Sequence, residues 1–361
     1  MDNSFRFHVK IKYFHGTLIV YGCRLTQQQS SIVSMKVLFI GGSGNISSAC
    51  TKEALAAGHE VFHFNRGISS DYSFGNDVVT ITGDINNPSD VLKINDYSPF
   101  DVVADFICFT PAQIQNDINF FKDKTGQFIF ISSATVYKKP PDQYIITEDC
   151  PLENPFWEYA RNKIACETLL SSQSELSYTI VRPSFTYGKT WIPVALTARE
   201  YNPVYRIQKG LPIISHGDGE SLWVMTHHND FARAFISLFG NSKALNNHFH
   251  ITSDEVLTWN QIYYIIGKII GIVPNLIHIP SDFINKIEPE WGAGLLGDKA
   301  YSAVFDNTKI KNATNGWKAK ITFEEGMRES ISWFMEKEER RQPDHNVEEK
   351  INRIIREYQI K

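Results

Sequence analysis

Short apolar runs alternate with longer, mixed segments through residues 35–133. Runs of this kind, stopped by glycine or polar residues, are typical of strands that are buried on both faces of a sheet. The chain between successive runs is long enough for a crossover connection, which parallel strands need and hairpins do not. The pattern therefore predicts an α/β fold with a doubly wound parallel sheet. The expected strands are Lys36–Ile40, Glu60–Asn65, Val78–Thr82, Val102–Phe109 and Gln127–Ser132.

The alternation ends after Tyr187, where prolines and glycines break it and helical periodicity then dominates. We therefore expect a second, smaller domain to follow the first. The last residues carry dense mixed charge, which is typical of a solvated helix. The expected helices of this half are Asp230–Phe239, Thr258–Ile270 and Phe323–Lys337. The expected domains are 35–187, then 188–335 with some elements returning to the first domain, then a charged C-terminal helix over 336–361.

Residues 1–34 lack a packing pattern that ties them to the strand after Met35. Basic residues precede a short apolar stretch, Thr17–Tyr21, in a weak likeness of a secretory signal. That stretch is too short for a signal and has no clear cleavage site. We expect residues 1–34 to be a disordered, dispensable extension, as if translation natively began at Met35. An extra hairpin is the alternative.

The composition is that of a folded protein without a general affinity for polyanions. Hydrophobic residues make up 42% of the chain and charged residues 21%, which is not the composition of a disordered chain. The formal charge of -4 and the pI near 6.3 argue against a general electrostatic affinity for nucleic acid or anionic lipid, with a local basic patch as the alternative. The cysteines are dispersed without zinc-ligand spacing, and no apolar run approaches the roughly 20 residues that span a bilayer. We expect a cytoplasmic protein with reduced thiols, no metal and no membrane contact.

A glycine-rich turn, Gly41-Gly-Ser-Gly44, separates the first expected strand from a helix expected over Ser48–Ala57. Gly41 permits a tight turn, and Gly44 lets the backbone approach a pyrophosphate. The start of the helix, including Asn45 and Ile46, offers free N–H groups and a positive dipole end to that anion. This order of strand, turn and helix predicts the binding of a dinucleotide cofactor.

The end of the second strand indicates which dinucleotide binds. An Asp or Glu there would bond the ribose hydroxyls of NAD, but the chain has Asn65 and Arg66. Arg66 is suited to the 2′-phosphate of NADP, so NADP is favoured over NAD; a surface arginine without a ligand is the alternative. Asp84, just past the third strand, is placed to contact adenine, and otherwise is a turn residue or helix N-cap.

Three further side chains predict acid–base chemistry. Tyr159 and Lys163 are four residues apart, which places both on one face of a helix. A phenol has a pKa of about 10, and a nearby cation moves it toward the working range. Ser133 ends the fifth strand, where its hydroxyl can hydrogen-bond a carbonyl or an alcohol, and Ser132 could partly replace it. We therefore expect Tyr159 to be the acid/base.

Five segments together resemble the extended short-chain dehydrogenase/reductase superfamily, in particular its NAD-dependent epimerase/dehydratase family. The resemblance covers roughly residues 35–334. It implies a Rossmann domain that binds NAD or NADP, and a smaller C-terminal substrate-binding domain. It also implies Tyr159 as acid/base, Lys163 as its partner and Ser133 as substrate hydrogen-bond donor. The segments are Gly41-Gly-Ser-Gly-Asn-Ile-Ser47, Ile131-Ser-Ser-Ala-Thr-Val-Tyr137, Tyr159-Ala-Arg-Asn-Lys163, Val181-Arg-Pro-Ser-Phe-Thr-Tyr-Gly188 and His227-His-Asn-Asp230-Phe-Ala.

Departures from the family pattern bear on the substrate. Where dehydratases of this family have an Asp-Glu pair, the chain has Ala134 and Thr135, as in a 4-epimerase. No arginine stands shortly before Asp230 to bind the phosphates of a UDP-sugar. This departure argues against a UDP-sugar, although Arg206 or Lys209 could supply the charge from elsewhere; Arg206 is expected to bind substrate.

The expected function is hydride transfer at a carbinol carbon of a sugar or sugar nucleotide, with Tyr/Lys/Ser catalysis. Epimerisation and simple oxidation or reduction both remain open. One alternative is an RNA-binding protein like the chloroplast stem-loop-binding proteins, which the chain resembles more distantly. The other is a non-catalytic, NADP-sensing regulator. The expected partners are a small-molecule substrate, no nucleic acid, and a second copy of the chain, since the superfamily commonly dimerises through the helix that here carries Ile164, Leu169 and Leu170.

Overall fold

The computed structural model describes residues 9–14, 17–22, 34–68, 72 and 74–360. By its internal contacts the chain divides into residues 1–33 and 34–361. In the first part, β1 (Val9–Phe14) and β2 (Thr17–Gly22) pair antiparallel, as in the alternative hairpin. The disorder expected for the rest of this extension lies outside the described residues, and its dispensability stays a prediction.

A seven-stranded, fully parallel sheet organises residues 34–361. This confirms the predicted Rossmann-like, doubly wound fold. The strand order reverses between β3 and β6, and ligands of such sheets bind at the carboxyl ends of the strands beside that reversal. In spatial order the strands are β14 (Asn247–Ile251), β9 (Tyr178–Pro183), β7 (Thr125–Ile131), β6 (Phe100–Asp105), β3 (Lys36–Ile40), β4 (Glu60–Asn65) and β5 (Val78–Thr82).

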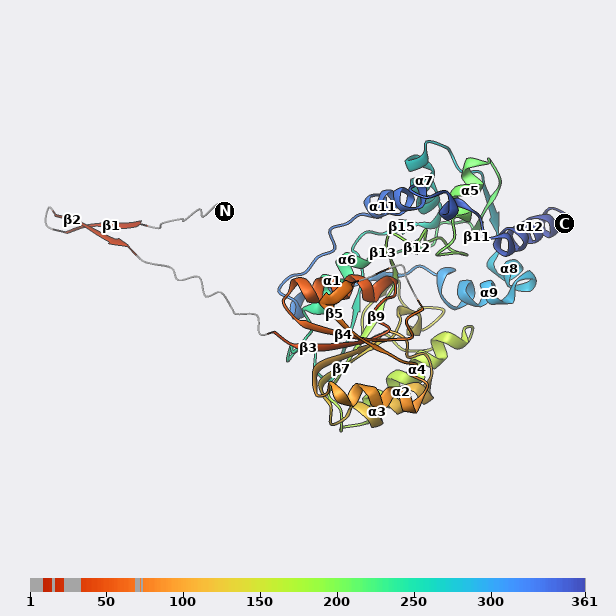
Figure 1. Cartoon of the computed structure of the whole chain (residues 1–361). Helices are drawn as coiled ribbons and strands as arrows, with labels where there is room; N and C mark the ends of the chain where they lie inside the picture. Colours follow the sequence, from red (N-terminus) through yellow and green to blue (C-terminus); the bar gives the residue numbers. More distant parts are fainter. Residues whose placement is uncertain (1–8, 15–16, 23–33, 69–71, 73, 361) are drawn as a thin grey trace. The chain divides into compact units, whose positions relative to one another are not determined.

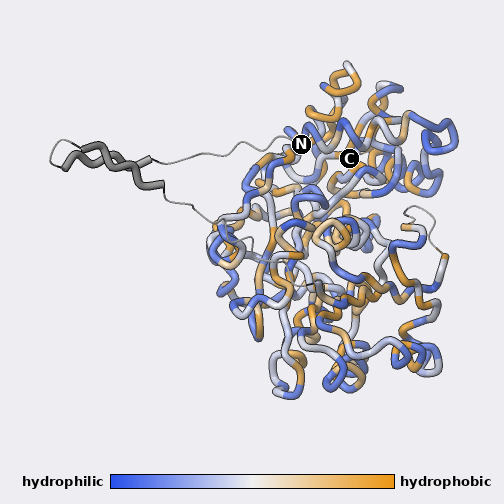
Figure 2. Tube along the Cα trace, turned by 60° about the vertical axis from the view of Figure 1, so that its left-hand side comes forward, coloured by the Kyte–Doolittle hydropathy of each residue, from blue (hydrophilic) through white to orange (hydrophobic). Residues whose placement is uncertain are grey.

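Helices cover both faces of the sheet (Figure 1), because its strands are apolar on both sides. Along β3, Val37 and Phe39 belong to one buried cluster, whereas Leu38 and Ile40 belong to the other. Figure 2 shows hydrophobic residues along the inner segments and hydrophilic residues at the outer turns. The first cluster includes residues of α1 (Asn45–Ala56), α6 (His228–Ile236) and α10 (Thr308–Ala313), and the second residues of η2 (Leu92–Asp96), α3 (Pro111–Phe121) and α4 (Glu158–Ser172). The short elements α2 (Pro88–Val91) and η1 (Gly75–Asp77) lie in the connections that flank β5.

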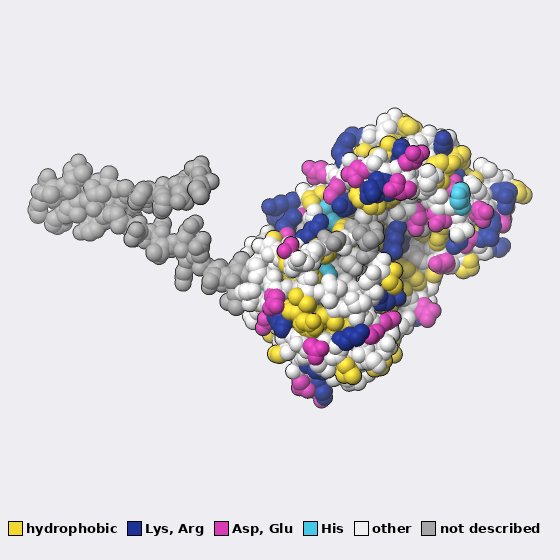
Figure 3. Space-filling view, in the orientation of Figure 1, with side chains coloured by type: hydrophobic (Ala, Val, Ile, Leu, Met, Phe, Trp, Pro, Cys, Tyr) yellow, Lys and Arg dark blue, Asp and Glu magenta, His cyan; other side chains and the backbone are white. Residues whose placement is uncertain are grey.

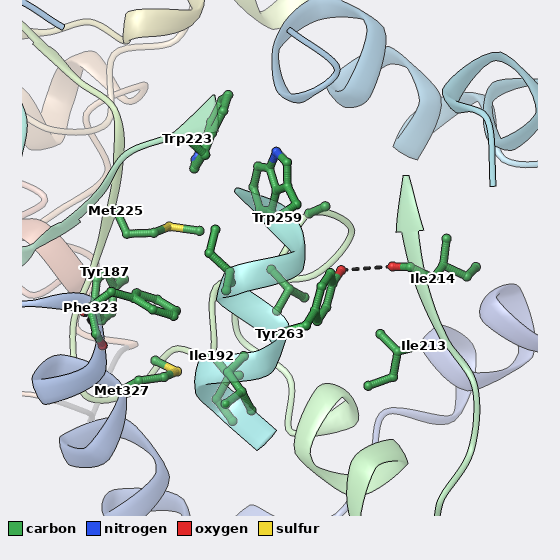
Figure 4. Packing of buried hydrophobic residues seen from close by; sticks show 14 of the residues in the cluster. Tyr187, Ile192, Ile213, Ile214, Trp223, Met225, Trp259, Tyr263, Phe323 and Met327 are labelled. Carbon is green, nitrogen blue, oxygen red and sulfur yellow. Dashed lines mark hydrogen bonds between the residues drawn. The ribbon is translucent and has the colours of Figure 1, made fainter. Parts of the chain in front are cut away.

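The remaining elements form a second lobe around a third hydrophobic cluster, part of which Figure 4 shows. Its strands pair two by two: β10 (Phe185–Tyr187) with β13 (Met225–His227), β11 (Ile213–His216) with β16 (Leu276–Ile279), β12 (Leu222–Trp223) with β15 (Leu257–Thr258), and β17 (Val304–Phe305) with β8 (Ile145–Ile146). Its helices are α5 (Asn202–Gln208), α7 (Trp259–Ile270), α8 (Ser281–Ile287), α9 (Pro289–Gly294), α11 (Phe323–Met335) and α12 (His345–Gln359), with the short turns η3 (Ala134–Val136), η4 (Leu295–Lys299) and η5 (Glu338–Arg341).

The charged C-terminal segment is not one solvated helix. Helix α12 begins only at His345 and buries Ile351, Ile354 and Ile355 in the second-lobe cluster. These isoleucines recur at the spacing of one helix face, a signal that the surrounding charge obscured.

The helix face expected at a dimer interface is partly used within the chain. Leu170 on α4 is fully buried in the cluster on one face of the sheet, and Leu169 packs against the same cluster. A homodimer therefore stays a prediction. Among the described residues, no helix combines the length and the apolar character that crossing a membrane requires.

Candidate active site

Neighbouring residues hold the glycine turn between β3 and α1 in one conformation. Gly41 has φ +79°, in the left-handed region that favours glycine. A Cβ on Gly42 would lie 2.3 Å from the ring of His63, which closes this position to larger residues. The Ser47 hydroxyl donates to the Gly41 carbonyl (2.6 Å) and accepts from the Gly44 N–H (2.8 Å). The turn is therefore formed before any ligand binds.

A cavity of about 460 Å³ opens beside this turn. The Arg66 side chain is exposed there and forms no hydrogen bond or ion pair within the described residues. Asp84 accepts hydrogen bonds from the backbone N–H and side-chain amide of Asn86 (2.9 and 3.1 Å), so it is also the turn residue of the alternative interpretation. The cavity lining includes five residues predicted to bind the cofactor, namely Gly41, Gly44, Asn65, Arg66 and Asp84.

Two further predicted cofactor residues begin α1. Asn45 lines an adjoining cavity of about 350 Å³, which shares Ser43 and Gly44 with the first. Its amide nitrogen donates to the Thr186 carbonyl (3.0 Å), and its amide oxygen is buried without a partner in the described part of the chain. The Ile46 side chain packs against the buried cluster on one face of the sheet, so the group that Ile46 can present to a cofactor is its backbone N–H. A buried oxygen without a partner beside an open helix start suits a bound polar ligand.

Ser133 and Tyr159 line a third cavity, of about 290 Å³. Ser133 follows β7 and accepts a hydrogen bond from the Thr135 N–H (3.2 Å), which fixes its side chain. Tyr159 lies in the first turn of α4, with its ring centroid 5.0 Å from that of Trp157. The structure thus brings together the strand-end serine and the helix tyrosine. Aromatic residues form much of the remaining wall, namely Trp157, Phe185, Trp191, Trp223 and Phe305.

Lys163, one turn further along α4, is almost fully buried. Its Nζ donates to the carbonyls of Cys108 (2.6 Å) and Ile131 (2.8 Å), and so joins the chain after β6 to the end of β7. Its Nζ lies 5.8 Å from the ring centroid of Tyr159. An ammonium has three N–H bonds, so one remains for a ligand.

The pKa of Tyr159 is shifted in the direction opposite to the predicted one. Burial raises it to about 12, and the Ser133 hydroxyl acts only partly against that shift. The ammonium of Lys163 is bound to two carbonyls and does not offset the burial. The predicted lowering was therefore wrong for the chain without ligand, because helical spacing does not report burial. Tyr159 keeps its proton at neutral pH.

Ser132 is not placed to replace Ser133. Its hydroxyl donates to Glu167 (2.5 Å) in a buried network. The guanidinium of Arg182 donates to both oxygens of the same carboxylate and, at 3.2 Å, to the hydroxyl of Tyr137. This network ties α4 to β7 and β9, which holds the active-site helix against the sheet.

A buried acidic pair lies next to Lys163. The carboxyl groups of Asp105, at the end of β6, and Asp117, on α3, lie close together and interact electrostatically. Burial raises the pKa of both carboxyls, and the Asp105 charge raises that of Asp117 further. Their oxygens and the Cys108 sulfur lie within 4.8 Å of one another, which is close enough for a metal ion. We assign no metal there, because the Lys163 ammonium already interacts electrostatically with Asp105.

Arg206, predicted to bind substrate, lies away from these cavities. Its guanidinium is buried and donates to the Pro212 carbonyl (2.8 Å), to Glu348 (2.6 Å) and to Asn352 (3.1 Å). The Arg206 guanidinium therefore holds α12 against α5 within the second lobe. This geometry does not support a role in substrate binding. Lys209 is exposed and does not line the cavity of Tyr159 either.

Sequence reasoning missed two charged residues of the Tyr159 cavity. Asp298 and Lys299, at the end of η4, line its wall. They stand far along the chain from Tyr159 and in no recognisable motif, so only the tertiary structure identifies them.

Most of the chain is similar to known proteins. The model of the NAD dependent epimerase/dehydratase family matches residues 37–252. The chloroplast stem-loop binding protein of 41 kDa b from Arabidopsis thaliana is 24% identical over 348 residues, which cover 91% of this chain and 86% of that protein. The 2'-dehydrokanamycin reductase of Streptomyces kanamyceticus is 23% identical over 273 residues, which cover 75% of this chain and 74% of that protein.

A solved structure shares the fold. An epimerase from Methanothermobacter thermautotrophicus matches with a TM-score of 0.70 at 16% identity, over 85% of this chain and 94% of that one. At this sequence identity, the structural similarity is evidence for the fold alone.

Proposed function

Because this chain belongs to the NAD dependent epimerase/dehydratase family, we propose that it transfers hydride between a nicotinamide cofactor and the carbinol or carbonyl carbon of a sugar or sugar nucleotide. The observation that carries the proposal is that Ser133 and Tyr159 line one cavity, with Lys163 a turn away on the same helix. A substrate oxygen in that cavity would have a hydroxyl donor on each of two elements.

The residues of the glycine turn suit a bound NAD or NADP. The open N–H groups at the start of α1 would hold the pyrophosphate, and Asp84 the adenine. Arg66, exposed and without a partner in the described residues, would meet a 2′-phosphate, which favours NADP. The third N–H of Lys163 would hold the nicotinamide ribose. The cofactor, when bound, supplies or accepts the hydride.

In the direction of reduction, Tyr159 would donate the proton from its hydroxyl to the reacting oxygen. The raised pKa supports this assignment, since the phenol is protonated at neutral pH. Ser133 would hydrogen-bond the same oxygen and orient it. Lys163 would position the ribose relative to the Tyr159 ring, because the Lys163 Nζ is itself fixed by hydrogen bonds to two carbonyls.

Epimerase and reductase differ in the fate of the cofactor. An epimerase returns the hydride within one active site and so retains an oxidised cofactor, whereas a reductase exchanges it at each turnover. Mass spectrometry of the purified protein separates these cases. A retained oxidised cofactor favours the epimerase, and an empty site that binds NADPH favours the reductase.

The central test is Tyr159→Phe, which removes the hydroxyl and keeps the ring. Single-turnover hydride transfer, read from the absorbance of reduced nicotinamide, should fall by roughly 10²–10⁴ while cofactor affinity survives. Tyr264→Phe is the matched control, because Tyr264 is half exposed on α7. Hydride transfer by Tyr159→Phe at the wild-type rate would refute the assigned acid/base.

A second candidate function is RNA binding, which the similarity to the chloroplast stem-loop binding protein over 91% of this chain favours. On the face shown in Figure 3, however, Lys and Arg are interspersed with Asp and Glu, without a continuous basic patch. Filter binding of structured RNA at physiological salt is the test. Tight, salt-dependent binding would support RNA binding, and its absence would favour the enzyme.

A further inference from the structure

The cavity beside Tyr159 contains an ammonium group that has no hydrogen-bond acceptor among the described residues. The Lys299 side chain lines that cavity with Ser133 and Tyr159. Its Nζ lies over the rings of Trp157 and Phe185, 5.5 and 5.7 Å from their centroids. Within the described residues, it forms no hydrogen bond and no ion pair. An ammonium that lies over aromatic faces without a hydrogen-bond acceptor keeps its N–H groups for a ligand.

The neighbouring carboxylate does not use up this charge. Asp298 lines the same cavity, and its Oδ1 is 3.6 Å from the Nζ of Lys139, whose side chain is 1% exposed. One carboxylate therefore faces two lysines, and Lys139 is the one in ion-pair range. Lys299 leaves a positive charge in excess at the wall of the cavity.

The backbone of Lys299 is fixed by unusually many donors. Its carbonyl oxygen accepts hydrogen bonds from His216 Nε2 (2.9 Å), Ser221 Oγ (3.2 Å) and Trp259 Nε1 (3.2 Å). Strand β11, helix α7 and the loop before β12 thus determine where the lysine side chain starts. Such pre-organisation lowers the entropic cost of binding a ligand.

A second donor in the same wall has no acceptor. The indole N–H of Trp223 is buried and unpartnered among the described residues, and Trp223 lines the cavity. Its ring packs 5.0 Å from that of Trp259 (Figure 4), so its position is fixed as well. The indole nitrogen itself is shielded, so Trp223 contributes a fixed wall, and the Lys299 ammonium is the donor that a ligand oxygen in the cavity can reach.

We propose that this cavity binds a compact substrate with an anionic oxygen group, a carboxylate or a phosphate, and that Lys299 is the residue that selects it. The proposal rests on the proposed function, since Tyr159 and Ser133 mark the end where the carbinol reacts. A volume of about 290 Å³ suits one sugar-sized ring rather than a whole sugar nucleotide. Other aromatic side chains of the wall, among them Trp191 and Phe305, offer apolar surface to such a ring.

The test is a titration of the tryptophan fluorescence of the full chain, with and without NADP, using three probes. Glucuronate and glucose 1-phosphate carry the two anionic groups, and glucose is the neutral reference. At least one anion should bind about tenfold or more tighter than glucose, because a hydrogen bond to a charged group is among the strongest. The anion that binds tighter identifies the group.

Lys299→Met removes the charge and keeps most of the side-chain volume, so the preference for the anion should disappear. Lys299→Gln serves the same purpose if the methionine variant does not fold. Lys309→Met is the matched control: Lys309 is also partly buried, with its Nζ 5.3 Å from the centroid of Phe249, but it does not line this cavity. It should keep the full preference.

Three results would overturn the proposal: equal affinity for glucose and both anions, an unchanged preference in Lys299→Met, or no saturable binding of either anion at millimolar concentration. None of them depends on turnover. If instead Tyr159→Phe kept its hydride transfer while Lys299→Met lost the anion, the assigned acid/base would fail and the anion site would stand.

Discussion

At the scale of single residues, Arg66 is the side chain most open to a cofactor. It is exposed in the cavity of the glycine turn, and no described residue engages its guanidinium. We expect Arg66→Ala to weaken NADP binding by about tenfold or more, the usual worth of a charge-assisted hydrogen bond, and to leave NAD binding nearly unchanged. Isothermal titration with both cofactors measures this.

Arg328→Ala is the control for that change, because Arg328 is exposed on α11 and pairs with Glu324 on its own helix. It should alter neither affinity. Equal losses for NAD and NADP in Arg66→Ala would contradict the assignment of Arg66 to the 2′-phosphate.

At the scale of elements, the turn between β3 and α1 depends on Ser47. Its hydroxyl bridges the Gly41 carbonyl and the Gly44 N–H, and it is buried. Ser47→Ala should cost about 1–3 kcal/mol of stability, because two backbone groups lose their partner, and should weaken cofactor binding as the turn loosens. Thermal unfolding and cofactor titration check both effects.

Ser48→Ala provides a comparison within the same helix, since the Ser48 hydroxyl makes one long bond to the Asn45 carbonyl (3.3 Å). Its effect on cofactor affinity should be clearly smaller. If both variants bound cofactor equally well, the Ser47 hydroxyl would not be needed to hold the turn in its cofactor-binding conformation.

Helix α12 is expected to be part of the folded core. Ile354 is completely buried against the second lobe, and Arg206 bonds Glu348 on the same helix. Ile354→Ala should therefore destabilise the protein by about 2–4 kcal/mol, the cost of a core truncation. Ile360→Ala, at a residue 78% exposed, should have little effect. Urea unfolding that did not separate the two variants would show α12 to be detached.

At the scale of the whole molecule, buried histidines make the fold sensitive to acid. Burial lowers the pKa of His63 to about 4 from an ordinary 6.5. His216, His228, His248 and His250 are shifted to about the same value. A lowered folded-state pKa means that the unfolded chain takes up protons first as pH falls below 6.5. These groups therefore remove stability between about pH 6.5 and 4.

His63→Gln tests this linkage. The variant should be less stable than the wild type at neutral pH, because His63 bonds Thr51 (2.8 Å) and packs on Gly42. Since only the wild type loses the His63 contribution in acid, the difference in melting temperature should narrow as pH falls from 7 to about 5. A difference that stays constant over this range would mean that His63 does not titrate between the two states.

Much of this protein follows from local sequence. The apolar runs, the glycine turn and the Tyr159–Lys163 spacing determined the parallel sheet and placed several site residues, because short-range periodicity reports backbone conformation directly. The two strands at one side of the sheet, β9 and β14, and the core face of α12 were not predicted, since their apolar residues are mixed with polar ones.

Only the tertiary structure decided which charged residues face the reacting end. Arg206 turned out to support α12, Ser132 to bond Glu167, and Lys299 to line the cavity of Tyr159. Burial likewise reversed the expected pKa shift of Tyr159. Burial and the contacts between distant segments depend on how the lobes pack, and the order of residues along one helix or strand does not contain that information.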